Sequence, residues 1–317
     1  MRLHVLYRSY GGENNKGRPP YYSKRLALIS FLRAYQNAPD VDVTFLNNVA
    51  GGPIAPDLMD LMQASGGRFV TLDEEHMRPS YRFAIKHAMS SDWADEDVVY
   101  LCEDDYLHTP AALDALDKAI RAMPEVSYFL TYGSTRSHAT EGVERHLANY
   151  PPRWRPGIST EVDGQAWHPG LSATSTYAVR LDAMRKDYSI ILQSHLPYRH
   201  HYLDHATGLV WQGYEPYRWG DIAREAAFQT RGDWRTKVRA AGESPFKVAF
   251  NLRAHRRQDN RRFLYVAAPN VATHLESEFL APGRNWAALA EETQQWFDGG
   301  GLAGPGEHIQ RETGATA

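Results

Sequence analysis

Three consecutive carboxylates, Glu103, Asp104 and Asp105, directly follow an apolar run in this chain of 317 residues. The run, residues 98–101, is β-branched and aromatic and predicts a buried strand, while Thr109 and Pro110 fit the N-cap and first position of a helix. If the extended geometry continues, Glu103 and Asp105 point to the same side and can share Mg²⁺ or Mn²⁺. The alternative is a solvated acidic turn that favours the next helix.

The segments around these acids alternate between strand-like and helix-like patterns. This alternation predicts an α/β fold with a doubly wound, mostly parallel sheet and helices on both faces. Ligands of such sheets bind beyond the carboxyl ends of the strands, where the acids would lie. Strands are predicted at 3–7, 41–46, 68–72, 98–102 and 126–132, and helices at 21–36, 57–65, 79–91 and 109–123.

The pattern changes from about residue 149, where a stretch rich in Pro, Gly and Trp begins. Such an irregular stretch is usually functional, so residues 150–170 are expected to form a lid over a binding site. Later elements are a strand at 175–180, a helix at 181–187, a strand starting at 262 and a helix at 285–297. We expect one domain over 1–298, with a first half of about 1–135, an elaborated second half of about 136–298, and a disordered tail at 299–317.

Composition excludes several classes of protein. The net charge of −3 gives no support to nucleic-acid binding, and no apolar run approaches the ~20 residues of a membrane span. The N-terminus shows no signal-peptide pattern, so a cytoplasmic enzyme is expected. The single cysteine, Cys102, rules out an internal disulfide framework and a cysteine-rich metal site, and is expected to be a small buried hydrophobe.

The loop after the first strand combines a pair of glycines with three cations, Arg8, Lys16 and Arg18. These groups could cradle a diphosphate, although the loop lacks the Walker pattern.

The stretch "EDDYLHTPAAL" resembles the Asp-x-Asp segment of family 2-like nucleotide-sugar glycosyltransferases, which have the GT-A fold. The resemblance makes Glu103 the first and Asp105 the second ligand of Mn²⁺ or Mg²⁺, with Glu in place of the usual Asp. Asp104 would contact ribose or sugar hydroxyls. His274 is similar to a further metal ligand of this fold, and a surface or packing histidine is the alternative.

The same resemblance implies that the half of about 1–135 binds the donor and the half of about 136–298 binds the acceptor. It also implies roles for further residues. The donor would contact Arg8, Arg18, Asp73 and Arg82, each of which is otherwise an ordinary solvated charge. An inverting enzyme needs a base, for which Asp204 and Asp221 are candidates unless they only cap their helices. Inversion is slightly favoured, and His274 as a metal ligand would fit retaining members instead.

The aromatic segment suits a sugar, glycoside or natural-product acceptor, so Trp167 and His168 are predicted acceptor contacts. The expected function is metal-dependent transfer of a sugar from a nucleoside-diphosphate sugar to a hydroxyl group. The alternatives are a sugar-phosphate nucleotidyltransferase and a non-catalytic carbohydrate-binding protein. Pyrophosphate release would identify the first, and absence of donor hydrolysis the second.

Overall fold

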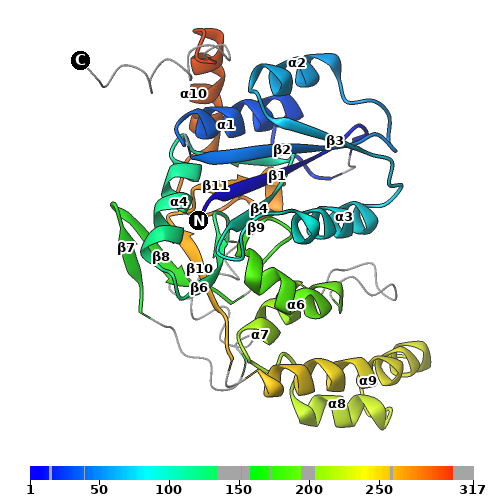
Figure 1. The fold of residues 1–317 in the computed structure, drawn as a ribbon. Helices are drawn as coiled ribbons and strands as arrows, with labels where there is room; N and C mark the ends of the chain where they lie inside the picture. The colour runs from blue at the N-terminus through cyan, green and yellow to red at the C-terminus, as the bar shows by residue number, and fades with distance from the viewer. Residues whose placement is uncertain are drawn as a thin grey trace.

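The computed structural model describes residues 1–13, 16–38, 40–133, 151, 158–171, 173–193, 204–257 and 260–302. Its centre is a nine-stranded mixed sheet in the order β3-β2-β1-β4-β9-β6-β10-β8-β7 (Figure 1). The strands are β1 (Leu3–Tyr10), β2 (Val41–Asn48), β3 (Arg68–Leu72), β4 (Val98–Glu103), β6 (Val126–Leu130), β7 (Thr160–Val162), β8 (Gln165–Pro169), β9 (Tyr177–Arg180) and β10 (Phe263–Ala268).

The direction of the strands confirms the predicted α/β fold and its parallel core. Strands β3, β2, β1 and β4 are parallel neighbours, and β6 is parallel to β10. One strand breaks the pattern, because β9 lies antiparallel between β4 and β6. The β7–β8 hairpin extends the sheet beyond β10 with antiparallel pairing.

Helices cover both faces of the sheet and bury two apolar layers, which explains why the strands are almost continuously hydrophobic. The first layer packs Phe31, Met62 and Leu116 against β1, β2 and β4, and the second packs Ile85, Met184 and Phe250 against the other face. Helices α1 (Lys24–Gln36), α2 (Pro56–Ala64) and α4 (Ala112–Ala122) supply the first layer. Helices α3 (Met77–Ser90), α6 (Leu181–Gln193), α7 (Asp204–Trp211) and α9 (Trp234–Arg256) supply the second.

A two-stranded ribbon lies beside the main sheet. Its strands, β5 (Tyr106–His108) and β11 (Ala272–His274), pair antiparallel, so that His274 stands opposite Tyr106. Leu107 and Ala272 pack with Trp286 at the start of α10 (Trp286–Asp298). The short 3₁₀ helix η2 (Ser277–Phe279) follows β11. This ribbon brings the late part of the chain against the acidic cluster.

The ends of three helices differ from those predicted from the sequence. Helix α4 begins at Ala112 instead of Thr109, whose backbone N–H donates to Val271 O across 2.8 Å and so continues the ribbon pairing. Helix α3 begins earlier than predicted, at Met77, and α6 continues to Gln193. Helix α6 extends because Ile190 and Ile191 in its additional turn pack in the second apolar layer.

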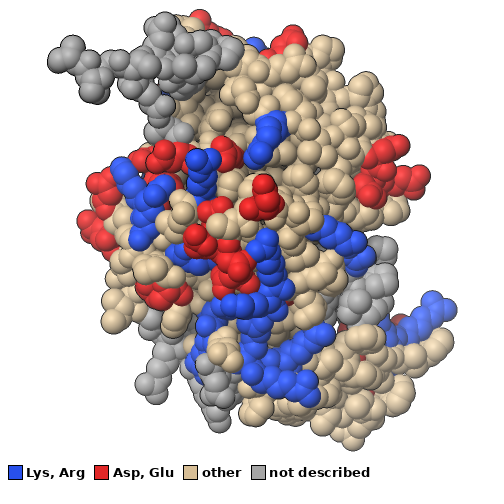
Figure 2. All heavy atoms as spheres, viewed as in Figure 1, with Lys and Arg blue, Asp and Glu red and all other residues tan. Residues whose placement is uncertain are grey.

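Helix α8 (Trp219–Ala226) packs along α9 at the end of the molecule, beyond α6 and α7 (Figure 1). None of the helices in the described ranges combines the length and apolarity that crossing a membrane requires. Figure 2 shows acidic and basic side chains intermingled on one face of the molecule, in keeping with the small net charge of −3. The predicted tail lies outside the described residues from position 303 onward.

Candidate active site

The three acids lie at the point where the strand order of the sheet reverses. Strand β1 is flanked by β2 on one side and by β4 on the other, so crossovers leave it in both directions. Ligands of open α/β sheets bind beyond the carboxyl ends of the strands at such a point. Here β1 ends in Arg8, Ser9 and Tyr10, and β4 ends in Glu103.

Glu103 is the last residue of β4, and the parallel register places it beside Arg8. Arg8 Nη1 donates to Glu103 Oε1 across 3.1 Å, and Ser175 Oγ donates to Oε2 across 2.7 Å. The Arg8 guanidinium also lies over the ring of Tyr81, at 5.2 Å from its centroid. Glu103 therefore fixes a cation at the end of β1.

Asp105 is held in a cluster of positive charge. Its Oδ2 atom lies 3.3 Å from Lys16 Nζ, 3.1 Å from Arg18 Nη2 and 3.0 Å from His274 Nε2. Only 4% of Asp105 is exposed. The hydrogen bond from His274 and the charges of the neighbouring cations hold the pKa of Asp105 well below its usual range, despite its burial.

The extended geometry ends at Glu103, because Asp104 and Asp105 form a turn between β4 and β5. The expectation that Glu103 and Asp105 point the same way as strand neighbours is therefore wrong. The turn lets each carboxylate reach a different cation: Arg8 pairs with Glu103, and Lys16 and Arg18 pair with Asp105.

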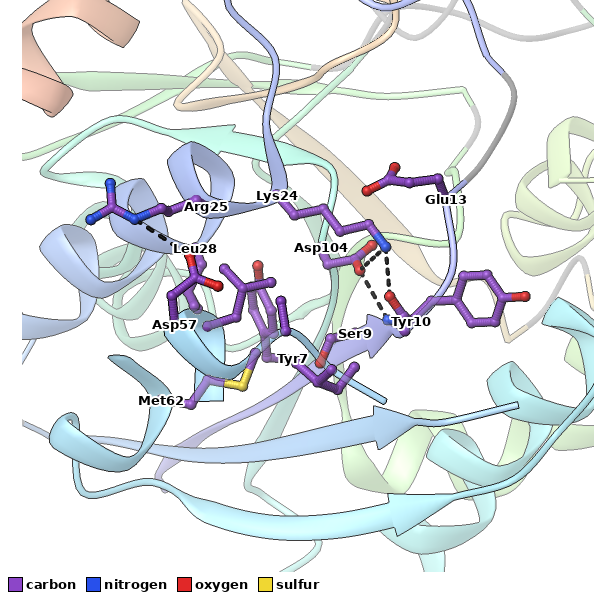
Figure 3. Close-up of a pocket in the computed structure, with 14 residues that line it drawn as sticks. Tyr7, Ser9, Tyr10, Glu13, Lys24, Arg25, Leu28, Asp57, Met62 and Asp104 are labelled. Carbon is purple, nitrogen blue, oxygen red and sulfur yellow. Dashed lines mark hydrogen bonds and ion pairs between the residues drawn. The ribbon is translucent and has the colours of Figure 1, made fainter. Parts of the chain in front are cut away.

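Asp104 faces the ends of β1 and α1 (Figure 3). Its Oδ2 accepts from the backbone N–H of Tyr10 across 2.9 Å and lies 3.5 Å from Lys24 Nζ. Lys24 also donates to the carbonyl oxygens of Tyr10 and Gly12. Burial raises the pKa of Asp104 to about 6, while the Lys24 charge opposes this shift.

The raised pKa of Asp104 predicts a pH-dependent cost to stability. The unfolded carboxyl ionises near its ordinary pKa of 3.8, and the folded one at about 6. Between these values the folded state binds more protons, so the free energy of unfolding falls as pH rises. Relative to Asp104→Asn, the wild type should lose roughly 2 to 3 kcal/mol between pH 4 and pH 7. Urea unfolding of both proteins across this range measures the difference, and a pH-independent difference would refute the assignment.

A cavity of about 240 Å³ opens beside the acids, somewhat smaller than the roughly 300 to 1,000 Å³ of typical small-ligand pockets. Strands β1, β2 and β4 and the β3–α3 loop all contribute to its wall. The residues around it include Arg8, Tyr10, Lys16, Asn48, His76, Ser80 and the three acids. A second cavity of about 200 Å³ lies on the α1–α2 side and shares Tyr10 and Asp104 with the first (Figure 3).

Glycines close the loops at the ends of β1 and β2. The Gly11 N–H donates to Asn48 O across 2.9 Å, which joins the two loops. A Cβ atom added to Gly11 would lie 1.7 Å from the carbonyl oxygen of Gly52, and Gly52 itself has a φ of +122°. A side chain at Gly11 would force the loops apart, while the positive φ of Gly52 is a conformation that other residues rarely adopt, so glycine suits both positions.

The predicted metal ligands are brought together only in part. His274 and Asp105 are in contact, but their facing atoms also lie close to the Lys16 ammonium. Both oxygens of Glu103 have protein partners. Within the described part of the chain, no group of three or more His, Cys, Asp or Glu side chains is positioned to hold a metal ion. This donor set does not fit Mn²⁺ or Mg²⁺, which prefer several free oxygen ligands.

The other predicted donor contacts are placed differently. Arg18 contacts Asp105 and Leu275 O, behind the cavity wall. Asp73 follows β3 as expected and is exposed, but the wall beside it is formed by Glu75 and His76. From α3 the described lining residue is Ser80 and not Arg82.

Trp167 is not an acceptor contact. It is fully buried in the first apolar layer and packs edge-to-face against Phe129 at 5.9 Å. The alternation of β8 turns the next residue, His168, to the other face, where it is half-buried and bonded to Ser159. Of the predicted lid, residues 150 and 152–157 lie outside the described part of the chain.

The two candidate bases differ in their location. Asp221 lies in the first turn of α8, is 49% exposed and forms an i,i+3 ion pair with Arg224 on the same helix. It is therefore a local surface pair, on a helix that lies far from β4 in Figure 1. Asp204 is the first residue of α7, and its side chain lies outside the described atoms. One turn later, Thr207 lines a small hollow with Thr174, whose neighbour Ser175 bonds Glu103.

Reasoning from sequence missed several residues of this site, among them Lys24, Asn48 and Ser175. Lys24 carried a signal, because a cation in the first turn of a helix opposes the helix dipole and so needs a local anion. Asn48 is a polar residue at the carboxyl end of β2. Polar residues at the carboxyl ends of such strands indicate the edge of the sheet where ligands bind. Ser175 carried none, since the antiparallel entry of β9 beside β4 brings it to Glu103.

Comparisons with known proteins give similarity of fold alone. No family model and no curated protein sequence matches this chain. Among solved structures, S. aureus TarS is similar over 59% of this chain and 30% of its own, with a TM-score of 0.36 and 10% identity. Mouse xyloside xylosyltransferase 1 matches over 61% and 72%, with a TM-score of 0.36 and 11% identity. A cytidylyltransferase from Leptospira borgpetersenii serovar Hardjo-bovis matches over 78% and 97%, with a TM-score of 0.37 and 11% identity.

Proposed function

We propose that this chain is a nucleotide-sugar-dependent glycosyltransferase whose donor binds in the cavity at the ends of β1, β2 and β4. One observation carries the proposal: Arg8 and Lys16, each held by an acid, face a cavity at the reversal point of a doubly wound sheet. Two fixed cations at this location suit a diphosphate, whose charge needs partners at a sheet edge.

The cavity also suits the remainder of such a donor. Asn48, His76 and Ser80 supply polar atoms on the side away from the acids, where a nucleoside can lie. Asp104 lines the wall between the two cavities and can accept hydrogen bonds from sugar or ribose hydroxyls when ionised.

The acceptor side of the proposal rests on α7. Asp204 begins this helix, and Thr207 one turn later lines a small hollow with Thr174, which precedes the residue that bonds Glu103. We therefore retain Asp204 as the proposed base of an inverting reaction, in preference to Asp221. An aspartate with an ordinary pKa of about 3.9 is ionised at neutral pH and can accept the proton of an acceptor hydroxyl.

Product analysis tests the proposed function. The protein is incubated with a panel of nucleoside-diphosphate sugars, with and without candidate acceptor glycosides, and the phosphorus products are separated. Glycosyl transfer releases the nucleoside diphosphate, and slow donor hydrolysis releases the same product when no acceptor is present. Release of pyrophosphate from a nucleoside triphosphate and a sugar phosphate would instead identify a nucleotidyltransferase. Binding of sugars without turnover of any donor would indicate a carbohydrate-binding protein.

A further inference from the structure

Glu103 and Asp105, at the end of β4, each form an ion pair with a cation of the same chain. Glu103 holds the guanidinium of Arg8 at 3.1 Å, and Asp105 holds the ammonium of Lys16 at 3.3 Å. Both cations line the 240 Å³ cavity beside their acids. Together they place two positive charges at the cavity wall, the same charge as one divalent ion.

The loop that carries Lys16 is fixed from behind. Arg18 donates to Leu275 O across 2.7 Å and stacks on Tyr22 with its guanidinium 4.2 Å from the ring centroid. The backbone N–H of Ser277 donates to Gly17 O across 2.8 Å, which joins this loop to the segment after β11. Lys16 Nζ also lies 3.5 Å from Glu276 Oε2. Lys16 is thus positioned by backbone and side-chain contacts in addition to Asp105.

Binding of a divalent ion at the acids would require breaking these pairs. An ion bound to Glu103 and to Oδ2 of Asp105 would displace Arg8 from Glu103 and Lys16 and Arg18 from Asp105. Oδ1 of Asp105 is buried without a hydrogen-bond partner, so it alone offers an ion a free oxygen among the partnered atoms of these two acids. Breaking a largely buried ion pair costs several kcal/mol unless both partners find new ones. The carboxylates are therefore already neutralised without a metal.

We infer that Arg8 and Lys16 replace the divalent metal and bind the diphosphate of the donor directly, an inference that rests on the proposed glycosyl transfer. Glu103 and Asp105 are positioning residues that hold the two cations at the cavity wall. Arginine suits this role because its planar fork binds phosphate oxygens in pairs, while lysine supplies a compact point charge. Nucleotide affinity is then independent of divalent metal and dependent on Lys16.

Calorimetric titration of the full chain with UDP, GDP, CDP, ADP and TDP, in EDTA and in manganese, tests the inference. At least one of them should bind in EDTA with a Kd within about threefold of its value in manganese. Lys16→Ala should weaken that binding about tenfold or more in both conditions, and Lys16→Arg should restore most of it. Lys118→Ala, which removes an exposed cation on α4 remote from the cavity, is the matched control and should leave the Kd unchanged.

Two results would overturn the inference in distinguishable ways. The first is binding that is lost in EDTA and recovered in manganese, or equal affinity of the wild type and Lys16→Ala. Either outcome would show that the cations do not replace the metal, and would leave the proposed function unaffected. No binding of any of the five nucleotides in either condition would overturn the inference together with the proposed function. Circular dichroism of each variant separates loss of binding from loss of folding.

Discussion

Asp105→Asn is expected to lower kcat at least a hundredfold while the fold stays intact. Asp105 Oδ2 is the common acceptor for Lys16, Arg18 and His274, so a neutral amide removes the charge that holds Lys16 at the cavity wall. Misplacing a group that stabilises the leaving diphosphate by about 1 Å can cost on the order of a hundredfold.

The kinetic constants distinguish positioning from simple charge loss. Removing a negative charge beside the cavity raises its positive potential, so the donor KM should stay level or fall while kcat drops. Asp117→Asn, which removes a half-buried acid paired with Arg121 on α4, is the matched control. Steady-state kinetics with the identified donor measure kcat and KM for both variants. A near wild-type kcat for Asp105→Asn would exclude Asp105 from the site.

Asp187→Asn is expected to reduce the free energy of unfolding by about 3 kcal/mol, because it leaves two partly buried cations without their buried anion. The Asp187 side chain is fully buried on α6 and accepts from Tyr128 Oη across 2.8 Å and from Arg262 Nε across 3.2 Å. It also pairs with Arg257 at the end of α9. One carboxylate therefore joins β6, α6, α9 and the start of β10.

The same helix offers a matched control for this stability prediction. Asp182 pairs with Lys186 across 3.1 Å at the surface of α6, and Asp182→Asn should change stability by about 0.5 kcal/mol or less. Urea denaturation of both variants gives the comparison. Equal effects of the two substitutions would mean that the buried charge cluster contributes no more than a surface pair.

The parallel core of the fold was predictable because its strands and helices show in patterns of residues that are close together in the sequence. The apolar runs at β1, β2 and β4 and the stripe of α1 are visible in sequence, and so is the acidic cluster that follows β4. Pairing between distant segments was not predictable. The insertion of β9 between β4 and β6, and the pairing of β5 with β11, depend on which sheet edges remain open after the core has formed.

The candidate site shows the same division. Arg8 and Glu103 were both predicted as donor or metal contacts, but their pairing follows from the register of β1 on β4. His274 reaches Asp105 only through the β5–β11 ribbon, across 169 residues of sequence. Trp167 was misassigned because a tryptophan in a Pro- and Gly-rich stretch resembles a binding residue, whereas β8 turns it into the core.

An experimental structure with a bound nucleoside diphosphate tests the central claim most directly. The account predicts the diphosphate within hydrogen-bonding distance, about 3 Å, of Lys16 Nζ and the Arg8 guanidinium. The nucleoside should occupy the cavity lined by Asn48 and His76. A nucleotide bound elsewhere on the molecule, or a diphosphate reached only through a metal ion on Glu103 and Asp105 with Arg8 and Lys16 displaced, would contradict it.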